Sequence, residues 1–202
     1  AGGRGDPHGG AGGHRGAESG GDGRGDVCDN DADGDGFFLH DEASCGTSDL
    51  DASDVPSDVD QDYIADCVDD DSDNDGYGDE LRGNNGDYCP TIVGTSTLDR
   101  LGCVDSDGDG WSDPDDTWNI NFGADAFPDE PTQHFDGDND GYGDNAEGVQ
   151  PDGCTNIAGT SFEDVFGCRD SDGDGWSDAY DAFNNDATQY SDQDGDGYGD
   201  LI

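Results

Sequence analysis

Acidic side chains dominate this chain and set the main constraint on its folding. Of the 202 residues, 53 are Asp or Glu and only 6 are Lys or Arg, so the formal net charge is −47. A charge of this size expands a chain by self-repulsion. Leu, Ile, Val and Phe together supply about 13% of the residues, below the roughly 20% under which a highly charged chain is expected to stay disordered. A large apolar core is therefore ruled out, and the chain either remains unfolded or folds around cations.

Composition also excludes several classes of function. Nucleic acid carries the same sign of charge and is excluded as a partner. No apolar run approaches the roughly 20 residues of a membrane span, so the sequence predicts none. With only 4 His and no pair of Cys separated by two residues, a zinc site is not expected either.

The acids are grouped in runs that share one register. Asp recurs at positions 1, 3 and 5, Gly follows at position 6 and an aromatic residue at position 7. In calcium-binding loops the side chains at 1, 3 and 5, the carbonyl at 7 and acids at 9 and 12 surround the ion. Three runs are complete: Asp105, Asp107, Asp109, Trp111, Asp113 and Asp116; Asp136, Asp138, Asp140, Tyr142, Asp144 and Glu147; Asp170, Asp172, Asp174, Trp176, Asp178 and Asp181.

Four further runs fit the register in part. The first contains Asp31, Asp33, Asp35, Phe37 and Glu42; it has Leu39 at position 9, and Asp29 is a substitute ligand. The second contains Asp71, Asp73, Asp75, Tyr77 and Asp79, with Arg82 at position 12, and the third contains Asp192, Asp194, Asp196, Tyr198 and Asp200 and stops before position 12. The fourth contains Asp58, Asp60, Asp62, Ile64, Asp66 and Asp69, with Tyr63 in place of the turn Gly. We call all seven the acidic loops and name each by its first Asp.

Seven runs in one register predict metal sites rather than solvated acidic surfaces. Calcium is favoured, because its oxygen ligands are many and flexible, whereas magnesium needs near-ideal octahedral geometry and transition metals prefer His or thiolate. We expect several ions, about one per loop, with spare acids (Asp69, Asp70, Asp115 and Asp129) available for more. The rings at position 7 are expected to pack on neighbouring segments.

Seven Cys add a second constraint. Cys89 and Cys103 are 14 residues apart, and so are Cys154 and Cys168; this repeated spacing predicts two disulfides, with Cys45 and Cys67 as the next pair. Each closed loop of this size stabilises by roughly 3 kcal/mol in the chain-entropy model. Cys28 is left over, either free or paired outside this segment. Disulfides imply an oxidising location, so we expect an extracellular or cell-surface protein.

The chain divides into a tail and three repeat units. Residues 1–25 are a Gly-rich flexible tail or linker. Residues 26–87 form a divergent unit, residues 88–152 a unit with an insertion at 117–124, and residues 153–202 a unit whose last loop is incomplete. The segments 89–113 and 154–178 match at an offset of 65, and 125–144 matches 181–200 at an offset of 56. The insertion carries Trp118, Ile120 and Phe122 and is expected to form a small apolar flap.

Regular secondary structure is expected to be sparse. Residues 96–101 and 161–166 read as helices of one or two turns, each starting at a Ser with an acid three residues on and stopped by Gly. The remainder is expected to be loop.

The runs Asp105–Asp113 and Asp192–Asp200 resemble thrombospondin type 3 repeats, in the versions found in large microbial surface and secreted proteins. The resemblance covers about residues 26–202. It implies a small, irregular fold of tandem calcium-wrapped, disulfide-stapled loop repeats that form an elongated rod. It also implies a role as stalk, spacer or adhesive segment.

These observations favour an extracellular calcium-binding structural repeat protein, a stalk or a filament-forming subunit. The incomplete last loop and the odd Cys28 suggest head-to-tail self-association. One alternative is an adhesin or carbohydrate-recognition module that uses Trp111, Trp118 and Trp176 as platforms; another is the calcium-binding linker of a secreted enzyme. No catalytic motif is present, so the chain is not expected to be an enzyme. Candidate sites for O-linked surface glycans are Thr95, Ser96, Thr97, Thr160 and Ser161.

Overall fold

The computed structural model describes residue 17 and residues 19–22, 24–80 and 86–200. It divides into two compact units, Ala1–Gly86 and Asp87–Ile202, and each is described here by itself. Most of the predicted Gly-rich tail, together with Arg82, lies outside the described residues.

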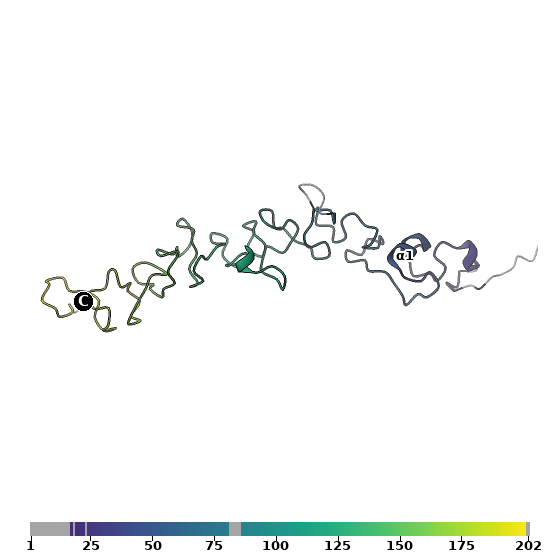
Figure 1. The fold of residues 1–202 in the computed structure, drawn as a ribbon. Helices are drawn as coiled ribbons and strands as arrows, with labels where there is room; N and C mark the ends of the chain where they lie inside the picture. Colours follow the sequence, from purple (N-terminus) through teal and green to yellow (C-terminus); the bar gives the residue numbers. More distant parts are fainter. Residues whose placement is uncertain (1–16, 18, 23, 81–85, 201–202) are drawn as a thin grey trace, which may run out of the picture. The chain divides into compact units, whose positions relative to one another are not determined.

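Loops make up nearly all of the described chain (Figure 1). Its helical elements are two 3-10 turns, η1 (Asp26–Cys28) and η2 (Ile120–Phe122), and one α-helix, α1 (Leu39–Cys45). The described residues contain isolated β-bridges, such as Gly143 with Pro151, but no strand. The prediction of an irregular fold is confirmed. Within the described part of the chain, no helix has the length and apolar character needed to cross a membrane.

The helices predicted at 96–101 and 161–166 do not form. The backbone N–H of Ser96 donates to Cys103 O at 3.1 Å, and the N–H of Leu98 donates to Gly110 O at 2.9 Å. The Ser96 hydroxyl donates to the carbonyl of Arg100 and accepts the N–H of Cys103 at 3.0 Å. These bonds to distant carbonyls replace those of a helical turn. Ser161 makes the equivalent contacts with Val165 and Cys168.

The three predicted disulfides are present: Cys45–Cys67, Cys89–Cys103 and Cys154–Cys168. Cys28 lies in η1, and its side chain is not among those that the structure describes. Three disulfides are consistent with a secreted protein.

The buried side chains are mainly polar. Small or lone apolar residues such as Ala32, Phe37 and Ala65 are buried, but the largest fully buried side chains include Gln133, Glu42 and Asp125. Ser96 and Ser161 are completely buried, so these two predicted glycan sites are wrong. The expectation that no large apolar core forms holds for the described residues.

Stacked rings take over part of the role of a core. The position-7 rings of four acidic loops pack on later segments, as expected: Phe37 on Tyr63, Trp111 on His134, Tyr142 on Phe166 and Trp176 on Tyr190. In the two Trp pairs the ring centroids are 4.6 and 4.3 Å apart, and the ring planes are nearly parallel. In the insertion, Trp118 stacks on Phe122, and the latter is 64% exposed, which fits a small apolar flap.

The close approach of Gly159 to Cys168, inside the loop closed by the Cys154–Cys168 disulfide, gives a first prediction. A Cβ atom at Gly159 would lie 2.0 Å from the carbonyl carbon of Cys168, whose oxygen accepts the N–H groups of Thr160 and Ser161. Gly159→Ala therefore forces backbone apart and should lower the free energy of unfolding by about 1–3 kcal/mol, measured by urea denaturation with near-UV circular dichroism. The control is Ala158→Ser on the exposed neighbour. Equal stability of the two variants would contradict the described approach of these backbones.

Candidate metal centres

Each acidic loop is closed by the same backbone hydrogen bond. The N–H at position 9 donates to the carbonyl of the residue before position 1, with N–O distances of 2.7–2.9 Å in all seven loops. Asp113 N–H, for example, donates to Val104 O, and Leu39 N–H donates to Asn30 O. The bond encloses a segment in which alternate side chains face inward. The loop of Asp58, which the sequence supports least, closes in the same way, from Asp66 to Ser57.

Backbone N–H groups then hold the carboxylates in place. In every loop the position-5 carboxylate accepts the N–H at position 7, at 2.7–3.0 Å. In six loops the position-1 carboxylate accepts the N–H at position 6, as Asp105 does from Gly110 at 3.0 Å. Such bonds between an Asp and the backbone a few residues on are typical of tight turns. At position 1 both oxygens can be engaged, as in Asp105, which accepts Gly108 N–H at Oδ1 and Gly110 N–H at Oδ2. At position 5 the bond uses one oxygen, and Oδ2 of Asp35 has no hydrogen-bond partner among the described residues.

Position 6 needs a left-handed backbone. The six Gly at this position have φ between 83° and 108°, a range that Gly adopts without steric cost. In the loop of Asp58 the residue is Tyr63, with φ 73°, which is strained for a bulky residue. Its ring packs on Phe37 at a centroid distance of 6.4 Å, and this contact offsets part of the strain.

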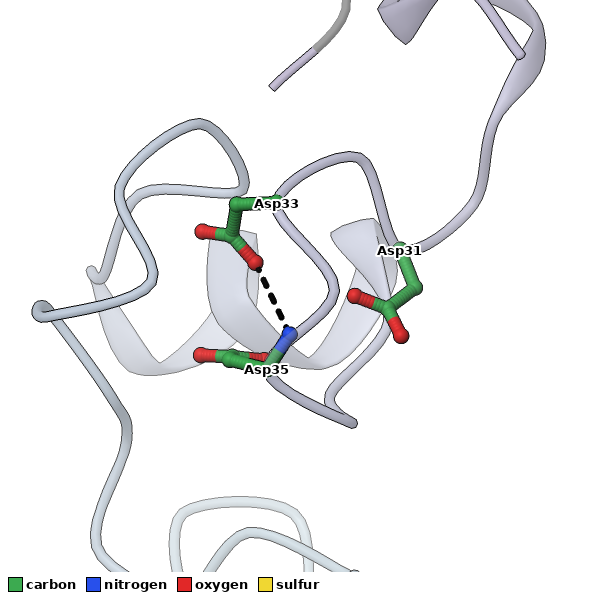
Figure 2. A group of neighbouring side chains, drawn as sticks. All are labelled: Asp31, Asp33 and Asp35. Carbon is green, nitrogen blue, oxygen red and sulfur yellow. Dashed lines mark hydrogen bonds between the residues drawn. The ribbon is translucent and has the colours of Figure 1, made fainter. Parts of the chain in front are cut away.

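The loops gather carboxylate oxygens at positions 1, 3 and 5. In five loops, those of Asp31, Asp58, Asp71, Asp105 and Asp136, three such oxygens lie within 4.8 Å of one another, and two further groups of this kind occur among the described residues. Figure 2 shows the first group, Asp31, Asp33 and Asp35, arranged around the turn, with the backbone N–H of Asp35 donating to Asp33 Oδ1 at 3.3 Å. Each of these groups has the donor set of a cation site.

A further buried carboxylate closes three of the loops. Asp125, Asp152 and Asp181 are 1%, 6% and 8% exposed. Each donates its N–H to the position-8 carbonyl of the preceding loop, at 2.9 Å, and accepts the N–H two residues on through Oδ1. The closing residue of the third loop, Asp181, is its predicted position-12 ligand. Asp125 and Asp152 were missed by the sequence analysis.

The predicted position-12 residues of the other two loops lie elsewhere. Asp116 and Glu147 are exposed, and the structure does not bring them to their loops' buried carboxylates. A signal in the sequence could have found Asp125, because it aligns with Asp181 at the offset of 56 and both precede Ala-Phe.

Glu42, the predicted position-12 ligand of the first loop, is buried and donates its N–H to the position-8 carbonyl of Phe38 at 3.0 Å. It lies on α1, is completely buried, and faces the charges of Asp35, Asp33 and Asp49. Asp49, which the sequence analysis did not select, also accepts the N–H of Ala32 at 3.2 Å. The first loop therefore draws carboxylates from α1 and from the segment after it.

The remaining predicted ligands have structural contacts of their own. Position-9 carboxylates accept the N–H at position 2, as Asp113 does from Ser106 at 3.0 Å; the others that do so are Asp66, Asp79, Asp144, Asp178 and Asp200. Asp29 and Asp69 each accept the N–H of the Asp two residues on, at 3.4 and 3.0 Å. Asp115, counted above as a spare acid, pairs with Arg100 at 2.5 Å.

Burial and mutual repulsion raise the pKa values of these carboxyls. Burial, with the charges of Asp35 and Asp33, raises the pKa of Glu42 to about 7. Burial and the charges of Asp109 and Asp107 raise the pKa of Asp125 to about 6. The pKa values of Asp33, Asp107, Asp138, Asp152 and Asp181 are raised by the same two causes, burial first. A cation at these positions would favour the ionised form.

The donor set suits a hard metal ion. Buried oxygens without a hydrogen-bond partner among the described residues include Oε1 and Oε2 of Glu42 and Oδ2 of Asp33, Asp35, Asp107, Asp125, Asp152 and Asp172. Buried polar atoms are normally paired, so this set of oxygens could serve as ligands of a hard metal ion. The clusters offer oxygen alone, as calcium prefers.

No protein-family model and no curated protein matches this chain.

The closing carboxylate gives a second prediction. Asp125→Asn removes a buried charge that faces Asp107 and Asp109 and should weaken calcium binding at that loop by about tenfold or more. Asp116→Asn, the matched control at the exposed position 12, should change the calcium affinity of the same loop by less than about twofold. Native mass spectrometry at limiting calcium should therefore count one ion fewer in Asp125→Asn alone. A loss confined to Asp116→Asn would overturn the assignment.

Proposed function

We propose that this chain is a calcium-dependent structural segment of an extracellular protein, in which bound calcium replaces the apolar core. The observation that carries the proposal is the set of buried, unpartnered carboxylate oxygens that face one another inside the acidic loops. A chain with so few apolar residues has no other source of cohesion of comparable size, apart from its disulfides and ring stacks.

Calcium rather than another divalent ion follows from the chemistry of the loops. Six to eight oxygens suit calcium, whereas magnesium keeps several of its waters and demands near-octahedral geometry. The carbonyl at position 7 is well placed to contribute, because the N–H of the same residue is already held by the position-5 carboxylate. When bound, each ion would supply two positive charges within a ring of acids.

A structural role fits better than recognition through the indoles. Trp111 and Trp176 stack on His134 and Tyr190, and Trp118 Nε1 donates to Asp99 Oδ2 at 3.2 Å. All three Trp are half-buried and none is a free-standing platform. The likeness to thrombospondin type 3 repeats, a calcium-stiffened rod and head-to-tail association belong to the same proposal.

Calcium removal tests the proposal. Because binding free energy is folding free energy when a site is absent from the unfolded chain, excess EDTA should abolish the near-UV circular dichroism of the stacked Trp rings. X-ray scattering should show the radius of gyration moving toward the value of about 48 Å expected for an unfolded chain of this length.

The control replaces calcium with sodium chloride at equal ionic strength, which screens charge without filling the loops. Sodium should not restore the spectrum, whereas added calcium should. A near-UV spectrum that is unchanged in excess EDTA would refute the proposal.

A further inference from the structure

A cavity of about 640 Å³ lies beside the loop of Asp136, within the second unit, and is lined by Trp111, Gly123, His134, Phe135, Asp144 and Asn145. Its volume is within the range of about 300–1,000 Å³ found for small-ligand sites. Trp111 and Asp144 also belong to acidic loops, whereas Gly123, His134 and Phe135 are not among the predicted metal ligands.

Aromatic rings form most of its wall. Trp111 and His134 stack at 4.6 Å with an angle of 3° between their planes, and Phe135 beside them is 51% exposed. The insertion supplies Gly123, which has a left-handed φ of 108° and lies against Trp118. Because Trp111 and His134 hold each other, the aromatic wall is preformed.

The cavity is specific to one of the two matching segments. At the offset of 56, Tyr190 and Ser191 replace His134 and Phe135, and the insertion that carries Gly123 has no counterpart. The Trp–ring stack itself is common to both segments, since Trp176 packs on Tyr190. The insertion and Phe135 therefore convert a packing contact into an open, aromatic-lined site.

The polar edge of the cavity is negative. Asn145 makes three hydrogen bonds: its backbone N–H donates to Gln133 Oε1, its Nδ2 donates to Thr132 O, and its Oδ1 accepts the N–H of Glu147. Asp144 accepts the N–H of Gly137 through Oδ1 and brings a carboxylate to the rim.

We propose that this cavity binds an organic cation, the guanidinium of an arginine side chain on a basic partner protein. Aromatic faces beside a carboxylate attract cations, and Arg stacks on rings while it pairs with carboxylates. The net charge of −47 attracts a basic partner and repels an acidic one.

The same unit already holds one of its own Arg side chains in this manner. Arg100 Cζ lies 5.8 Å from the centroid of the Trp118 ring, and its Nη1 is 2.5 Å from Asp115 Oδ2. The Arg100 side chain is only 12% exposed, and this pairing lowers the pKa of Asp115. An aromatic ring and a carboxylate are therefore sufficient in this chain to hold a guanidinium group.

The test is a titration with N-acetyl-arginine amide, with N-acetyl-citrulline amide as its uncharged isostere, followed by two-dimensional NMR. It runs at about 0.15 M salt, where charges farther apart than roughly 8 Å are screened. The arginine compound should shift the resonances of His134, Phe135 and Gly123 selectively, and citrulline should not. Phe135→Ala should weaken binding by about fivefold or more. Phe162→Ala, at an equally exposed Phe (51%) outside the cavity lining, should leave it unchanged.

The proposal rests on the calcium-dependent fold, because Trp111 and Asp144 belong to two acidic loops. Each titration is therefore run in saturating calcium, with the bound ions counted by native mass spectrometry. If calcium is bound but the arginine compound shifts all acidic loops alike, or Phe135→Ala has no effect, the cavity proposal falls and the calcium proposal stands. Selective shifts by methyl glucoside in place of arginine would also overturn it, in favour of a carbohydrate site.

Discussion

Repulsion between clustered carboxylates is the constraint on which the structure depends. Two unit charges about 4.8 Å apart repel by roughly 3–4 kcal/mol at an effective dielectric constant of 20, and five of the acidic loops bring three carboxylate oxygens within that distance of one another. Backbone N–H groups donate to one or both oxygens of the loop carboxylates and hold them in place, but they add no net charge. Only cations inside the loops can turn this repulsion into attraction.

The spacing of residues within each acidic loop is constant, whereas the distance along the chain from the loop to its closing carboxylate varies. Positions 1 to 9 keep one register because a single hydrogen bond from position 9 closes each loop. The closing residue, by contrast, follows position 9 by 12 residues at Asp125, by 8 at Asp152 and by 3 at Asp181. The cost of lengthening a connecting loop grows only slowly with its length, so the intervening segment is free to carry an insertion. An ion bound at such a site ties that segment to the loop.

This difference explains how far the sequence could predict the site. Local chemistry sets the loop register, so Asp107 and Asp109 could be selected from spacing alone, and repeated spacing also predicted two of the three disulfides. A fixed position 12 works where the connection is short, as at Asp181, or where a helix follows, as at Glu42. It fails at Asp116, where the insertion separates the loop from Asp125. The match between residues 125–144 and 181–200 identifies Asp125 as the counterpart of Asp181, whereas the calcium-loop register does not.

The wrong helix predictions have a related cause. A capping Ser and an acid three residues on stabilise a helix only if the next N–H groups have no better partner. Near Ser96 they have one, because the disulfide brings Cys103 O within reach. Hydrogen bonds to residues distant in the sequence cannot be predicted from a pattern of a few neighbouring residues.

The aromatic residue at position 7 links the ions to the rest of the fold. At Trp111 the N–H is held by Asp109, the carbonyl is free to face the loop, and the ring stacks on His134 from a later segment. An ion that fixes the carbonyl therefore also fixes the ring, and the ring fixes the next segment. Under the proposed function, charge neutralisation inside one loop would in this way be converted into packing outside it, so that a chain with few apolar residues could order segments that bind no ion themselves.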